Sequence, residues 1–145
     1  MSIFNPSRDQ VREFFFDVWR KHQQNALLTP LESMALQVIL MHEEYHAVLS
    51  QPEQYIQQDY FPEQGESNPF LHMSLHLSIL EQISINQPLG IREIYQQLLA
   101  RYQDEMQAQH QIMECLAEAI WQAQRQQQPL DAAHYQRQLQ ALLGA

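Results

Sequence analysis

The sequence has little of what several protein classes require. Its 145 residues include one cysteine, which cannot form an internal disulfide, and three glycines. Lysine and arginine number 8 against 17 aspartates and glutamates, which gives a formal net charge of -9. Binding to nucleic acid or to an anionic membrane surface relies on clustered positive charge. The composition therefore argues against both of these partners.

Long apolar runs are also missing. No window approaches the roughly 18 apolar residues of a membrane-spanning helix. The N-terminal segment lacks the basic stretch and apolar core that are typical of a signal peptide. We therefore expect a cytoplasmic protein that folds as a single domain over residues 1–145 and takes a small-molecule ligand or substrate.

What the sequence does contain is typical of helices. Glutamine, leucine, alanine and glutamate are abundant, whereas β-branched residues are sparse. Apolar residues recur at helical spacing over most of the chain. These patterns predict an all-α protein with a four-helix-bundle-like core and an additional C-terminal helix.

Helix starts are marked clearly. Ser7 with Gln10 and Thr29 with Glu32 both fit a capping box, and Pro30 stands at the first position of its helix. The helices are expected at residues 7–24, 30–50, 69–86, 91–127 and 131–143. Residues 51–68 are rich in proline, glutamine and acidic residues and predict a loop with one short helical turn near Tyr55.

The expected helix over residues 91–127 is unusually long. At a rise of 1.5 Å per residue it would extend ~55 Å, which is more than a compact bundle of this size needs. The sequence in this range contains neither proline nor glycine. We therefore expect a kink or an overhanging end.

The most informative feature is a set of ligating residues spaced four apart. The three pairs are His42 with His46, His72 with His76, and His110 with Glu114. Four residues make about one helical turn, so both members of a pair should point the same way. A single histidine on an apolar stripe is ordinarily a core residue bonded to a carbonyl, but three such pairs in one register favour a shared metal. The pattern predicts a metal site in the interior of the bundle.

The number of donors indicates two ions. A catalytic zinc uses three protein ligands, whereas this set offers five imidazoles and a carboxylate, with Glu43, Glu81 and His22 in reserve. Helical bundles can hold dinuclear sites bridged by carboxylates. Imidazole ligands suit transition metals and disfavour Mg²⁺ and Ca²⁺. We therefore predict iron or zinc, with two ions and a role in small-molecule binding, redox or sensing.

This donor set resembles that of the hemerythrin-like proteins. In that family two irons are held in a four-helix bundle by five histidines and two bridging carboxylates. The order differs, because the family places its His-x-x-x-Glu pair before its His-x-x-x-His pair and here His110 and Glu114 come last. The segments His42-Glu43-Glu44-Tyr45-His46 and Asn68-Pro69-Phe70-Leu71-His72 also resemble a proteobacterial family of uncharacterised proteins, which implies no activity.

A metal-dependent hydrolase is the first alternative. His42, Glu43 and His46 match His-Glu-x-x-His, in which two histidines bind zinc and the glutamate activates a bound water as general base. Glu43 is thus the candidate catalytic residue. Metalloproteases of this type usually bind an extended substrate along a sheet edge, and the sequence predicts no strand.

Two further alternatives are a site with fewer metal-binding residues and a metal that has no catalytic role. A mononuclear site with three histidines would resemble that of the DinB-like proteins, which include a His-x-x-x-His pair. A structural protein would use the metal only to stabilise its fold. The structural case requires every coordination position to be filled by protein, since catalysis needs an open one.

Overall fold

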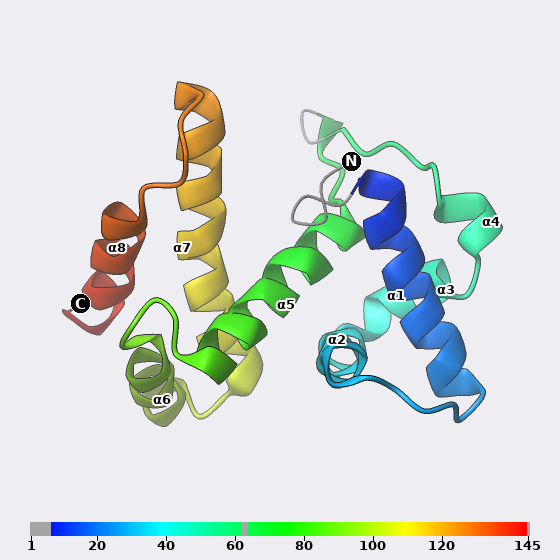
Figure 1. Ribbon diagram of the computed structural model, residues 1–145, viewed down its shortest axis with the longest axis horizontal. Helices are drawn as coiled ribbons and strands as arrows, with labels where there is room; N and C mark the ends of the chain where they lie inside the picture. The colour runs from blue at the N-terminus through cyan, green and yellow to red at the C-terminus, as the bar shows by residue number, and fades with distance from the viewer. Residues whose placement is uncertain (1–6, 62–63, 145) are drawn as a thin grey trace. The chain divides into compact units, whose positions relative to one another are not determined.

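The computed structural model describes residues 7–61 and 64–144, which form helices and connecting loops with no strand among them (Figure 1). The all-α prediction is therefore confirmed. The chain divides into two compact units, residues 1–77 and 78–145, and α5 (Pro69–Ile85) runs through the boundary. Within the described ranges, no helix is long and apolar enough to cross a membrane.

Before α5, the described residues of the first unit form helices and a 3₁₀ turn. They are α1 (Arg8–Gln23), α2 (Pro30–Met41), the 3₁₀ turn η1 (Glu43–Tyr45), α3 (His46–Leu49) and α4 (Pro52–Tyr55). Helix α1 packs against α2 and α3. Apolar side chains at helical spacing on α1 and α2 form the core, and the best buried are Phe15, Val18, Ala35, Val38 and Ile39.

The predicted helix starts are confirmed. The Ser7 hydroxyl accepts from the Gln10 backbone N–H, and the Gln10 side chain accepts from the Ser7 backbone N–H in return. Thr29 and Glu32 form the same reciprocal pair at the start of α2. Each capping box satisfies backbone N–H groups that lack partners inside the helix, so it fixes where the helix begins.

The loop over residues 51–68 contains the predicted helical turn, α4, and is attached to α1 through Arg12. The Arg12 side chain is buried, and its Nη1 donates to the carbonyls of Tyr55, Ile56 and Gln58 at 3.1, 3.1 and 2.8 Å. Its guanidinium also lies over the ring of Phe70, 4.7 Å from the centroid. A buried cation therefore replaces regular secondary structure as the anchor of this segment.

The second unit contains the end of α5 and three further helices, α6 (Ile91–Tyr102), α7 (Glu105–Gln126) and α8 (Ala132–Gly144). The three pack against one another, in agreement with the predicted bundle-like packing. Tyr135 on α8 donates a 2.6 Å hydrogen bond to Gln82 on α5. The fully buried core residues include Ile79, Ile91, Leu98, Ile112 and Leu139.

The helix predicted over residues 91–127, with a kink or an overhanging end, is instead two helices, because the chain breaks completely between α6 and α7. Gln103 adopts a left-handed conformation with φ of 54°, and Asp104 then caps α7 by accepting from the N–H groups of Met106 and Gln107. The break allows α6 and α7 to pack against each other. Asp104 followed by Glu105 was the available signal, since aspartate is a preferred cap residue and acids favour a first turn.

The single helix predicted over residues 30–50 is wrong. Helix α2 ends at Met41, and His42 follows with the non-helical angles φ −123° and ψ 70°. The η1 turn then separates His42 from His46, the first residue of α3. The two histidines therefore do not share one continuous helix.

Acid should weaken the first unit through Glu32. The Lys21 ammonium donates to this carboxylate at 2.6 Å, and the Thr29 N–H donates at 2.9 Å, which together lower the pKa of Glu32. A lowered carboxyl pKa contributes stability above the unfolded-state value of about 4.3, and this contribution is lost as the pH falls through the folded-state pKa. The unfolding free energies of wild type and Glu32→Gln in urea should therefore differ at pH 7 and converge as the pH falls from about 4.3 through the lowered folded-state pKa. Glu118→Gln, which alters an exposed carboxylate, should show no such convergence.

Candidate metal centre

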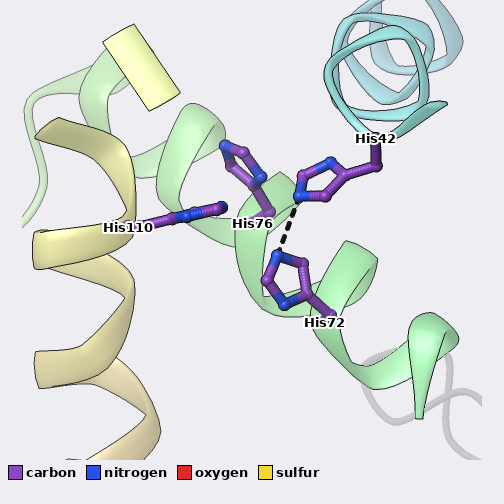
Figure 2. A group of neighbouring side chains, drawn as sticks. All are labelled: His42, His72, His76 and His110. Carbon is purple, nitrogen blue, oxygen red and sulfur yellow. Dashed lines mark hydrogen bonds between the residues drawn. The ribbon is translucent and has the colours of Figure 1, made fainter. Parts of the chain in front are cut away.

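Three histidines of the first unit bring ring nitrogens together. His42 follows the end of α2, and His72 and His76 lie one turn apart on α5. One ligand atom from each lies within 4.8 Å of those of the others. Figure 2 shows these rings turned toward one another, with His42 and His72 joined by a dashed line. The predicted convergence of His42 with the pair on α5 is therefore observed.

The three rings are close enough to coordinate one ion after small movements. The Nε2 atoms of His42 and His72 lie 2.9 Å apart, and the ring centroid of His42 lies 5.1 Å from that of His76. Tetrahedral coordination with bonds of 2.0–2.1 Å would separate two nitrogen ligands by about 3.3 Å. His42 and His76 are 2 % and 0 % exposed, so an ion bound here would be shielded from water on their side.

The backbone determines which nitrogen of His42 is available. Its Nδ1 lies 2.8 Å from the Val38 carbonyl oxygen, which can only accept, so Nδ1 carries the proton. The Nε2 lone pair of neutral His42 then faces His72, whose Nε2–H donates to it. Metal binding to both Nε2 atoms requires His72 to carry its proton on Nδ1 instead. The carbonyl of Val38 thus orients His42 in the way that outer-shell partners orient metal-binding histidines.

Tyr45 forms one wall of the histidine group. Its ring stacks on that of His42 with a centroid distance of 5.2 Å and an interplanar angle of 4°, and it meets His72 edge-on at 5.9 Å. Burial raises the pKa of the Tyr45 phenol, so it stays neutral at neutral pH. The sequence alone does not predict that Tyr45 contacts His42. The contact forms because the η1 turn after His42 folds Tyr45 back onto the His42 ring.

His46 does not join the group. Its Nε2 lies 2.8 Å from the Ile39 carbonyl oxygen, and its ring contacts that of Trp19 in a tilted arrangement, with a centroid distance of 4.4 Å and an interplanar angle of 31°. His22, an additional donor considered from the sequence, also lies beside Trp19, with a centroid distance of 5.6 Å. The structure therefore separates the members of the first predicted pair.

The predicted carboxylates lie on exposed positions. Glu43 is the first residue of η1, Glu81 lies on α5 and Glu114 lies on α7, and all three are exposed. In the described part of the first unit, no carboxylate accompanies the three histidines. His110 is half-buried on α7 and belongs to the second unit.

The ligand atoms of the three-histidine group are imidazole nitrogens, which are intermediate between soft thiolate sulfur and hard carboxylate oxygen. Imidazole nitrogens bind zinc, iron, copper and nickel better than they bind magnesium or calcium, which prefer oxygen. Only neutral imidazole can coordinate, so binding competes with protonation. The group is therefore compatible with a transition-metal ion at neutral pH.

Comparisons with known proteins place the chain in a family. No curated protein matches it, and no solved structure does so. A family model matches residues 7–141, which is nearly the whole chain. The chain belongs to the family described as a domain of unknown function, DUF1841.

Proposed function

We propose that this protein binds a transition-metal ion through His42, His72 and His76 and uses it to bind or sense a small molecule. The observation that carries the proposal is the approach of three imidazole nitrogens to within 4.8 Å in a largely buried position. Burying three polar rings side by side costs free energy, and coordination to one ion offsets this cost.

We propose His110 as the fourth ligand on the basis of its place in the sequence. It follows the buried Gln109 and precedes Ile112 by two residues on α7, so it borders the apolar stripe of that helix. Four imidazoles fill a tetrahedral zinc site, whereas iron takes five or six ligands and would keep open positions. A small molecule would bind at such an open position.

One ion is favoured over the two of a hemerythrin-like centre. A dinuclear site needs bridging carboxylates, and Glu43, Glu81 and Glu114 are all exposed. The sequence therefore suggested more carboxylates for bridging two ions than the structure places in buried positions. Two irons remain the alternative that the metal stoichiometry tests.

A hydrolase built on Glu43 is less well supported. The motif requires both histidines to reach one ion from a single helix turn. Here the η1 turn separates His46 from His42, and the His46 ring bonds to the Ile39 carbonyl instead. A fold-stabilising zinc with four histidines is the stronger alternative, because it needs no open coordination position.

Elemental analysis with a visible absorption spectrum tests the proposal. Protein expressed in metal-replete medium should contain one transition-metal ion per chain, and His110→Ala should lower its affinity. A stoichiometry of two irons with iron-oxo absorption would favour the dinuclear alternative. One colourless zinc that is insensitive to added small ligands would favour the structural one. Absence of bound metal would refute the proposal.

A further inference from the structure

A second candidate site lies in the first unit, apart from the histidine group. A cavity of about 590 Å³ opens between α1 and the segment that contains α3 and α4. Sites for small organic molecules typically have volumes of about 300–1,000 Å³. None of the three histidines of the candidate metal centre lines this cavity.

Apolar and aromatic side chains line one part of the cavity. Phe16 and Trp19 come from α1, and Leu49 and Ile56 come from the opposite side. Phe16 and Leu49 are 6 % and 2 % exposed, so they belong to the packed core and are held in place. The Trp19 indole N–H donates to the Ser50 hydroxyl at 3.0 Å, which fixes the orientation of its ring. This wall suits the aromatic or alkyl body of a ligand.

The remainder of the lining is negatively charged. Glu13 and Asp17 on α1 and Glu53 on α4 contribute three carboxylates, and Arg20 is the only cationic lining residue. Arg20 forms an ion pair with Asp17 at 3.0 Å. Glu13 and Glu53 have no ion pair with the described residues, so two negative charges stay uncompensated beside the aromatic wall.

We propose that this cavity binds an organic cation, a protonated amine or quaternary ammonium group carried on an aromatic or alkyl body. The body contacts the partly exposed side chains of Trp19 and Ile56, and the cationic group lies near Glu13 and Glu53. The negative charge selects against anions, and the apolar wall favours a cation with an organic body over a small hydrated metal ion.

Fluorescence titration with matched probes tests this proposal. A Trp121→Phe background leaves Trp19 as the only tryptophan of the chain. The probes are 2-phenylethylammonium, neutral 2-phenylethanol and phenylacetate, which have similar bodies and different charges. Exposed ion pairs each contribute about threefold in affinity, so the cation should bind about tenfold more tightly than the alcohol at low salt. Phenylacetate should bind more weakly than either.

Charge variants locate the effect. Glu13→Gln with Glu53→Gln should abolish most of the preference for the cation while leaving alcohol binding unchanged. The control, Glu93→Gln with Glu118→Gln, removes the same charge from the second unit and should preserve the preference. Equal affinities for cation and alcohol, or equal losses in both double variants, would overturn the proposal. Metal content should be the same in all of these proteins, so this test is independent of the metal centre.

Discussion

Replacing His42 by alanine is expected to remove the metal ion from the protein. His42 provides an Nε2 lone pair whose direction is fixed by the bond between Nδ1 and the Val38 carbonyl. Loss of even an outer-shell partner lowers metal affinity by 10–100-fold, so loss of this ligand should lower it by at least about 100-fold. Competition with a chromophoric chelator measures the affinity, and elemental analysis measures the metal retained after gel filtration.

Thermal unfolding should show the same loss. An ion present at 1,000 times its dissociation constant stabilises the folded state by about 4.1 kcal/mol. The wild-type melting temperature should therefore fall on chelation, whereas that of His42→Ala should not respond to metal or chelator. His72→Ala provides a second test, because His72 is only half-buried and its replacement disturbs packing less.

His46→Ala is the matched control. It removes the other histidine of the same predicted pair, but this ring contacts Trp19 and the Ile39 carbonyl. Its metal content should equal that of wild type, although its stability should fall with the loss of the ring contact and of the bond to the Ile39 carbonyl. Loss of metal from His46→Ala as well as from His42→Ala would restore the His-Glu-x-x-His interpretation, in which both histidines are ligands.

The sequence predicted those features that depend on local interactions. The starts of α1 and α2 follow from Ser7 and Thr29, whose caps involve residues only three positions away. The start of α5 is similar, since the Asn68 side chain accepts from the N–H groups of Phe70 and Leu71. His72 and His76 lie on that continuous helix, so their shared direction could be predicted as well.

The break at His42 could not be predicted, because it depends on contacts with α1. Neither proline nor glycine interrupts residues 31–51, and helix propensity alone would continue α2. The observed turn instead lets the His46 ring contact Trp19 and bond to the Ile39 carbonyl. Trp19 lies 27 positions earlier in the chain, so no local pattern signals this contact. Tertiary packing thus determined which histidine faces the site.

Arg12→Met should destabilise the first unit strongly. Methionine keeps much of the length and apolar surface of the arginine stem but has no donors. The carbonyls of Tyr55, Ile56 and Gln58 would lose their common partner. One Nη1 group has two hydrogens for three acceptors, so the three bonds do not contribute in full, and we expect a loss of about 2–4 kcal/mol. Urea unfolding in the presence of chelator measures this loss without the contribution of bound metal.

Arg20→Met is the control for helix α1. Arg20 is exposed and pairs only with Asp17 three residues away, so its replacement should change the unfolding free energy by no more than about 0.5 kcal/mol. Limited proteolysis adds a local readout. In Arg12→Met the exposed Arg8–Asp59 ion pair would remain as a link between α1 and residues 55–60, but an exposed pair contributes little stability, so this segment should be cleaved faster. Similar unfolding free energies for the two variants, with unchanged cleavage, would show that the loop is held by its other contacts. Unfolding in the presence of chelator therefore measures how much Arg12 stabilises the loop, without the contribution of a metal ion bound by the histidines that follow α2 and lie on α5.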